Sequence, residues 1–200
     1  NHTRDFGDAG LRDTEAALAE YGVAGIPGNQ GQCFELRHDN GDTLRLGGIL
    51  LKAIGTPGHT AGEVSYFLPG ERALFAADAL FSLGCGRLFE GDAAQMWDSL
   101  QRLRALPDDT LLYCGHEYTA TNARFALDVD PGNLLLQERV KEVEALRVAR
   151  QATLPVELGR EKKTNPFLRV DDPELQVAFG MAGADPVEVF AALREKRNGY

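Results

Sequence analysis

The chain has 200 residues, of which 44% are apolar and 26% are charged, and it carries a formal net charge of -9 at pH 7. These values are ordinary for a soluble globular chain and leave room for one full domain and a small second one. They argue against a nucleic-acid-binding protein, because binding phosphates requires a basic patch and the Lys and Arg residues here are scattered until the last few residues.

The cysteine spacing and the lengths of the apolar runs indicate the cellular compartment of the protein. Cys33, Cys85 and Cys114 are an odd number without close-paired spacing, which indicates neither a disulfide framework nor a cysteine-rich zinc site and favours a reducing compartment. No apolar run approaches the roughly 20 residues of a membrane span, and the first residues lack the apolar core of a signal peptide. We therefore expect a protein of the cytoplasm or the mitochondrial matrix with no membrane partner, or one whose targeting segment has been removed.

The first part of the chain predicts a loop, a helix and then strands. Residues 1–10 are polar, and residues 11–21 place apolar side chains at helical spacing before Gly22. From Cys33 the hydrophobic period changes to two, and the Asn-Gly pair at 40–41 predicts a hairpin turn. The predicted strands are 33–38, 43–46, 49–54, 63–68 and 72–77.

The later part of the chain predicts a helix, one more strand and then only helices. Residues 93–106 form an amphipathic pattern with Met96 and Trp97 on the apolar face, and a strand follows at 110–114. The helices predicted after His116 are 119–127, 131–150, 172–181 and 185–196. We therefore predict an α+β protein with one domain at 1–117 and a helical domain at 118–200.

Three segments each end on a residue type that binds metal ions. His59 follows Thr-Pro-Gly at 56–58, Asp78 follows the apolar run 73–77, and His116 follows Tyr-Cys-Gly at 113–115. Imidazole nitrogens and carboxylate oxygens are common zinc ligands. The sequence therefore predicts a metal site where these segments meet.

Four motifs in this order resemble glyoxalase II, the hydroxyacylglutathione hydrolases of the metallo-β-lactamase superfamily. The motifs lie at residues 56–62, 80–91, 113–119 and 163–169. The resemblance implies the αββα sandwich of that superfamily, followed by a helical domain that helps to bind glutathione. It also implies hydrolysis of S-2-hydroxyacylglutathione thioesters, with S-D-lactoylglutathione giving D-lactate and glutathione.

The resemblance further implies roles for individual residues. In the family two ions of zinc, iron or manganese share a bridging hydroxide that attacks the thioester carbonyl. His59 matches a ligand of the first ion, His116 a ligand of the second, and Asp78 the carboxylate between them, so these are also the expected catalytic residues. The residues expected to hold the glutathione carboxylates are Arg87, Tyr118, Arg194 and Lys196.

The start of the chain departs from the family's Thr-His-x-His-x-Asp-His signature. Residues 1–10 keep His2 at the first ligand position, whereas Arg4, Phe6 and Gly7 stand at the other three. A guanidinium at position 4 would repel a divalent cation and pair with Asp78 instead. The strands that precede the signature in the family have no counterpart here. Three explanations are open: the chain is incomplete, a protein partner covers the exposed edge of the sheet, or the first half of the domain has been rebuilt.

Smaller departures keep two alternatives open. Glu63 replaces a second histidine, Ala77 and Ala79 replace the neighbours of the bridging aspartate, and Phe89 replaces a tyrosine. The first alternative is a catalytically inactive relative that binds no ion and serves as a binding or structural subunit of a larger assembly. The second is a site for one ion, with an altered substrate.

Overall fold

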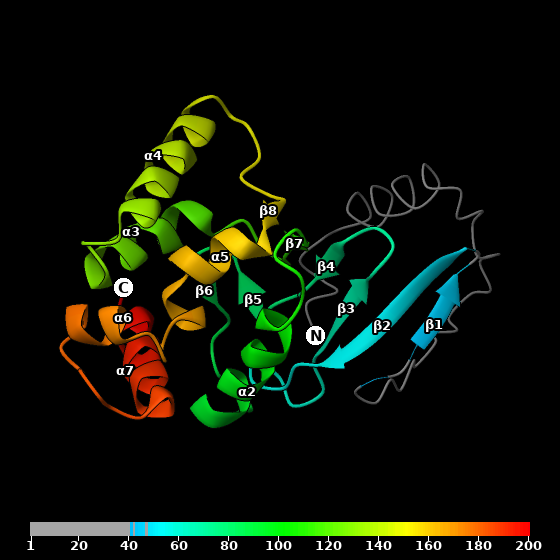
Figure 1. Ribbon diagram of the computed structural model, residues 1–200, viewed down its shortest axis with the longest axis horizontal. Helices are drawn as coiled ribbons and strands as arrows, with labels where there is room; N and C mark the ends of the chain where they lie inside the picture. Colours follow the sequence, from blue (N-terminus) through cyan, green and yellow to red (C-terminus); the bar gives the residue numbers. More distant parts are fainter. Residues whose placement is uncertain (1–40, 42, 47) are drawn as a thin grey trace. The chain divides into compact units, whose positions relative to one another are not determined.

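The computed structural model describes residues 41, 43–46 and 48–200 (Figure 1). The helix predicted at 11–21, the strand predicted at 33–38 and the residues of the signature window, His2 included, lie outside the described residues. The chain divides into two compact units, residues 1–37 with 45–49 and residues 38–44 with 50–200. The second unit contains the three residues of the predicted metal site.

The main sheet of the described residues places the ends of two strands side by side. Its order is β1 (Thr43–Leu46), β2 (Ile49–Gly55), β3 (Val64–Leu68), β4 (Ala73–Phe75), β7 (Leu111–Tyr113) and β8 (Val156–Glu157). The predicted hairpin of β3 and β4 is confirmed as an antiparallel pair, whereas β4 and β7 are parallel, with Phe75 opposite Tyr113. Because parallel strands end at the same edge, the segments after β4 and β7 leave the sheet together.

Two short pairings differ from the expectation. The segment after His116 was expected to be wholly helical, and this is wrong at β8, which pairs antiparallel with β7. A strand of two residues is too short to show a period of two, so the sequence carries no signal for it. The glycine-rich segment after Asp78 was expected to be a loop, but it contains a small hairpin of β5 (Leu80–Phe81) and β6 (Gly84–Cys85).

The helices predicted from residue 93 onward are present in the predicted order, whereas the helices at 158–164 and 166–168 were not predicted. The helices are α2 (Ala93–Arg104), α3 (Thr119–Val129), α4 (Leu134–Val148), α5 (Leu158–Thr164), the 3₁₀ helix η1 (Pro166–Leu168), α6 (Pro173–Ala178) and α7 (Pro186–Asn198). Asp185 caps α7 as predicted, and its carboxylate accepts the Val187 N–H. By contrast, α4 does not begin at Pro131, because the Asn133 side chain accepts the Leu136 N–H and caps the helix there. No helix among the described residues is long and apolar enough to cross a membrane.

One apolar core joins the sheet to the helices that follow it. Leu74 and Leu112 of the sheet, Leu100 of α2, and Phe167 and Phe190 of the C-terminal helices are fully buried in the same cluster. The predicted apolar face of α2 is confirmed, since Met96 and Trp97 also belong to this core. Burying aromatic and aliphatic side chains from both parts stabilises them as one unit.

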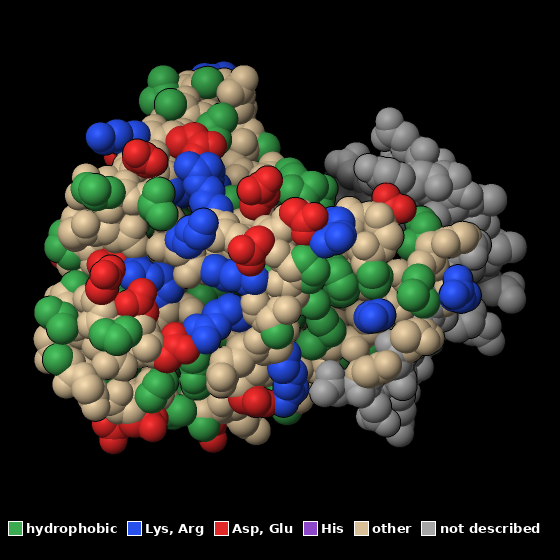
Figure 2. All heavy atoms as spheres, in the orientation of Figure 1, with side chains coloured by type: hydrophobic (Ala, Val, Ile, Leu, Met, Phe, Trp, Pro, Cys, Tyr) green, Lys and Arg blue, Asp and Glu red, His purple; other side chains and the backbone are tan. Residues whose placement is uncertain are grey.

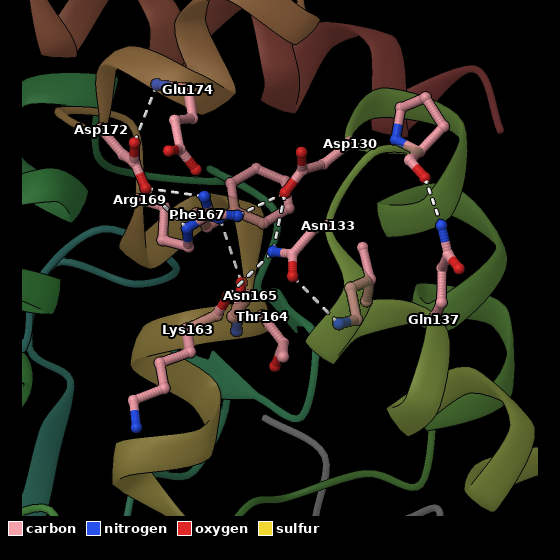
Figure 3. A network of polar contacts seen from close by, with 12 residues as sticks. Asp130, Asn133, Gln137, Lys163, Thr164, Asn165, Phe167, Arg169, Asp172 and Glu174 are labelled. Carbon is pink, nitrogen blue, oxygen red and sulfur yellow. Dashed lines mark hydrogen bonds and ion pairs between the residues drawn. The ribbon is translucent and has the colours of Figure 1, made fainter.

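Ion pairs at the surface link the helical segments to one another and to neighbouring loops. Figure 2 shows Lys and Arg side chains interleaved with Asp and Glu side chains. Pairs with nitrogen–oxygen distances of 2.5–2.6 Å include Lys162–Asp108, Arg104–Asp171 and Arg160–Glu142. Below the surface, Arg169 binds both Asp130 and Asp172, and the Asn133 amide donates to Asp130 and to the Lys163 carbonyl (Figure 3). This network ties the turn between α3 and α4 to the segment around η1.

Candidate metal centre

One carboxylate lies between the two histidines that the sequence predicted. The Nε2 atom of His59 is 3.4 Å from Oδ2 of Asp78, and the Nε2 atom of His116 is 3.5 Å from Oδ1 of the same residue. Each carboxylate oxygen therefore faces one imidazole. The three residues come from the β2–β3 loop, the turn after β4 and the turn after β7.

The rings of both histidines are fixed by neighbouring groups. The Nδ1 atom of His59 lies 2.9 Å from the Arg87 carbonyl oxygen. A carbonyl oxygen only accepts, so Nδ1 carries a proton, and Nε2 is the ring nitrogen that faces Asp78. The ring of Phe89 packs on His59 with centroids 5.0 Å apart, and Tyr118 stacks on His116 at 5.1 Å.

The turn that carries Asp78 is held by close contacts. The Asp78 N–H donates to Oε1 of Glu63 at 2.9 Å, so the residue that replaces a family histidine supports the backbone of the predicted bridging aspartate. Burial raises the pKa of the Glu63 carboxyl group. A Cβ atom at Gly115 would lie 2.6 Å from Asp78 Oδ1, and one at Gly86 would lie 2.1 Å from the Asp78 carbonyl oxygen. Only glycine fits at these two positions.

Ala77, directly before Asp78, has a φ of 43° in the left-handed region. An alanine in this region is strained relative to glycine. We expect Ala77→Gly to raise the free energy of unfolding by about 1 kcal/mol, because relief of strain outweighs the added freedom of the unfolded chain. Urea denaturation measures the change. Ala61→Gly, in an exposed loop position without positive φ, is the control and should lower stability; equal effects of the two changes would contradict the strain.

The donor atoms around Asp78 suit a pair of divalent ions. One imidazole nitrogen and one carboxylate oxygen face each of two positions on either side of Asp78. Among residues 41, 43–46 and 48–200, no group of three or more His, Cys, Asp or Glu side chains is arranged to hold one ion. Since zinc generally takes four ligands in proteins, each position needs further ligands from outside these residues or from water.

The four residues predicted to bind substrate occupy different environments. The Arg87 side chain is exposed, and Tyr118 is 49% exposed beside His116. Arg194 is buried, and its Nη1 atom donates to the carbonyl oxygens of Cys85 and Gly86 at 2.8 and 3.3 Å. The Nζ atom of Lys196 lies 2.8 Å from Asp128, so its charge already has a partner. Among the described residues, Arg87 and Tyr118 are therefore the two of the four whose side chains are exposed to solvent without an ionic partner.

Arg197 is a neighbour of Arg87 and Arg194, although the sequence gave no reason to select it from the basic run at the end of the chain. Its Nη2 atom donates to Asn122 Oδ1 at 3.1 Å, and burial together with the charges of Arg194 and Arg87 lowers its pKa. In the part of the chain that the structure describes, Arg87, Arg194 and Arg197 form no ion pair with a carboxylate. Three neighbouring guanidinium groups that no carboxylate of the described residues neutralises favour binding of an anion.

Comparison with known proteins decides the family. Residues 33–116 match the metallo-beta-lactamase superfamily, and residues 117–200 match the C-terminus of hydroxyacylglutathione hydrolase. A hydroxyacylglutathione hydrolase of Bradyrhizobium sp. (strain ORS 278) is 55% identical over 189 residues, which cover 94% of this chain and 69% of the relative. The chain belongs to the hydroxyacylglutathione hydrolase family.

Other matches agree with this family and fold. The hydroxyacylglutathione hydrolase of Rhodospirillum rubrum is 55% identical over 160 residues, which cover 80% of this chain and 62% of that protein. The chain thus spans about two thirds of the length of these curated relatives. The crystal structure of ETHE1 from Myxococcus xanthus is similar with a TM-score of 0.52 and 28% identity, over 92% of this chain and 62% of that one. The predicted metallo-β-lactamase fold with a C-terminal helical region is confirmed.

Proposed function

We propose that this protein hydrolyses S-2-hydroxyacylglutathione thioesters, with S-D-lactoylglutathione giving D-lactate and glutathione, with the help of two divalent ions. The observation that carries the proposal is the sharing of the Asp78 carboxylate between His59 and His116, together with three neighbouring arginines that form no ion pair with any carboxylate of the described residues. Membership of the hydroxyacylglutathione hydrolase family supports the same reaction.

The residues of the site would hold the ions as follows. His59 would give Nε2 to one ion, His116 would give Nε2 to the other, and Asp78 would give one oxygen to each. Zinc, iron and manganese all accept this mixture of nitrogen and oxygen donors. When bound, such a pair polarises the thioester carbonyl, brings the ionisation of water near neutral pH and stabilises the leaving thiolate.

The other side chains would bind and orient the substrate. The exposed guanidinium of Arg87 and that of Arg197 would attract the two carboxylates of glutathione. Tyr118 and Phe89, which are 49% and 66% exposed, offer aromatic surface on the two sides of Asp78. Lys196 would have to leave Asp128 before it could contact the substrate. The Arg194 guanidinium already donates to the Cys85 and Gly86 carbonyls, so it would shape the site without contacting the substrate.

The test is a hydrolysis assay with two thioesters on protein loaded separately with zinc, iron and manganese. We expect S-D-lactoylglutathione to be hydrolysed with a higher kcat/KM than S-lactoyl-N-acetylcysteamine, which keeps the thioester and lacks both carboxylates. Thiol release measured with a chromogenic disulfide follows both reactions. Protein that binds metal ions and hydrolyses neither thioester would contradict the proposal. That result would favour the alternative of an inactive relative, which no observation on the described residues favours.

A further inference from the structure

The segment Phe81–Arg87, named here the site loop, is held by side chains at every residue. The backbone of each loop residue forms a hydrogen bond with a side chain from outside the loop. Six of these residues are bound by helices that follow His116 or by Asn165 beside them, and the seventh, Arg87, is bound by His59. The partners, in loop order, are Asn165, Asn122, Glu161, Asn165, Arg194, Arg194 and His59.

Glu161 of α5 binds two adjacent residues of the site loop, Ser82 and Leu83. Its side chain is fully buried, and its Oε1 atom accepts the Ser82 hydroxyl at 2.8 Å. Its Oε2 atom accepts the Leu83 N–H at 2.7 Å and the Asn165 amide at 3.1 Å. Burial raises the pKa of this carboxyl group, so its placement is unfavourable unless the donors around it compensate.

Leu83, whose N–H donates to Glu161, has a strained backbone. Leu83 has a φ of 58°, a conformation that leucine rarely adopts. Its side chain is fully buried in a cluster with Ala123 and Ala126 of α3 and Leu136 of α4. A conformation of this kind persists only where its surroundings enforce it. The carboxylate and this apolar cluster enforce it here.

The site loop is joined in turn to His59. The Arg87 carbonyl binds Nδ1 of the His59 ring at 2.9 Å. The Phe89 N–H donates to the His59 carbonyl, and the Gly91 N–H donates to the Gly58 carbonyl, both at 3.2 Å. The ring of His59 therefore rests on the last residue of the site loop, and its backbone rests on the segment that follows the loop.

We propose that Glu161 is a positioning residue, which fixes the site loop and thereby the Arg87 carbonyl that orients the His59 imidazole. This inference rests on the proposed function, because it takes His59 to be a metal ligand. Groups that orient a metal ligand typically change metal affinity or activity by about 10- to 100-fold when they are mutated. Glu161 would act in this way although it belongs to the helical region.

The test uses Glu161→Gln, which keeps the size of the side chain and replaces one acceptor oxygen by an NH₂ group. Amide hydrogen exchange by NMR gives a readout that needs neither metal nor substrate. We expect faster exchange at Leu83 and also at Phe89 and Gly91, and about a tenfold loss of zinc affinity in competition with a chelator. At a temperature well below unfolding, kcat should fall more than KM rises.

Two further variants test the same positioning role. Ser82→Ala removes a single bond to Glu161 and should change the same readouts in the same direction by less, even if Glu161→Gln does not fold. Gln176→Leu is the matched control, because Gln176 is buried and binds three backbone groups around 170–184 without touching the site loop. It should lower thermal stability and leave zinc affinity and Phe89 exchange unchanged.

The outcomes separate this inference from the proposed function. Faster exchange confined to Leu83, with wild-type exchange at Phe89 and Gly91 and wild-type zinc affinity, would overturn the positioning role. Unaltered protein that binds no zinc and hydrolyses no thioester would instead contradict the proposed function. The exchange at Phe89 and Gly91 would still decide whether Glu161 fixes the backbone at His59.

Discussion

Asp78→Asn is expected to reduce zinc affinity and kcat/KM for S-D-lactoylglutathione by more than about a hundredfold, because Asp78 is proposed to contact both ions directly, whereas Glu161 is proposed to act through His59. The substitution keeps the shape of the side chain and removes its negative charge. It also places an NH₂ group opposite one of the two imidazoles, where an acceptor oxygen now faces Nε2 at 3.4 or 3.5 Å. Both effects weaken binding of a cation between these residues.

Isothermal titration with zinc and steady-state kinetics measure this change. Asp98→Asn is the control, since Asp98 is a largely exposed carboxylate whose ionic partner is Arg102 on the same helix. It should leave zinc binding and kcat/KM unchanged. A wild-type rate and wild-type zinc affinity in Asp78→Asn would show that the ions, if bound, lie elsewhere in the molecule.

Arg169→Ala is expected to lower the free energy of unfolding by about 3 to 5 kcal/mol, the usual effect of removing one partner from a buried ion pair. Arg169 is 8% exposed and binds Asp130 through Nη1 and Asp172 through Nε and Nη2 (Figure 3). Removing the guanidinium leaves the Asp130 carboxylate buried, with Asn133 as its remaining partner in this network.

Thermal unfolding should reveal the change as a fall in Tm of roughly 10 °C for a chain of this size. Arg124→Ala is the control, because Arg124 is exposed and makes one 3.4 Å contact with the Thr121 hydroxyl. Its stability should stay within about 0.5 kcal/mol of the unaltered protein. Similar Tm values for the two variants would contradict the role given to the network.

Much of the fold follows from patterns that the sequence carries openly. The strands at 43–46 and 49–54, the hairpin around Pro69 and the amphipathic helix after Asp92 each have a clear period and a turn or cap. The helix that begins after Asp185 was predicted from its cap and its following proline. These features are local, so neighbouring residues are enough to specify them.

The contacts around the site loop could not be predicted, because they depend on distant residues. Glu161 lies in the run Arg-Glu-Lys-Lys, which has the composition of an exposed helix surface, yet it is fully buried 78 positions from Leu83. Arg197 likewise lies in a basic run and is distinguished only by its neighbours Asn122 and Arg194. A sequence period reports which face of a helix is apolar and gives no signal for one buried charge.

The site itself was predicted in part. The motifs placed His59, Asp78 and His116 correctly at the ends of neighbouring elements, and the structure brings these side chains together. The roles of the three residues as ligands stay a prediction. The signature window at residues 1–10 lies outside the described residues, so the structure adds no ligand to this set from His2.

An anomalous difference map of crystals grown with zinc would show whether His59, Asp78 and His116 share a pair of metal ions. We expect one anomalous peak in contact with His59 and Asp78 and a second in contact with Asp78 and His116. Zinc peaks found only at other residues, with no density beside the Asp78 carboxylate, would contradict this expectation.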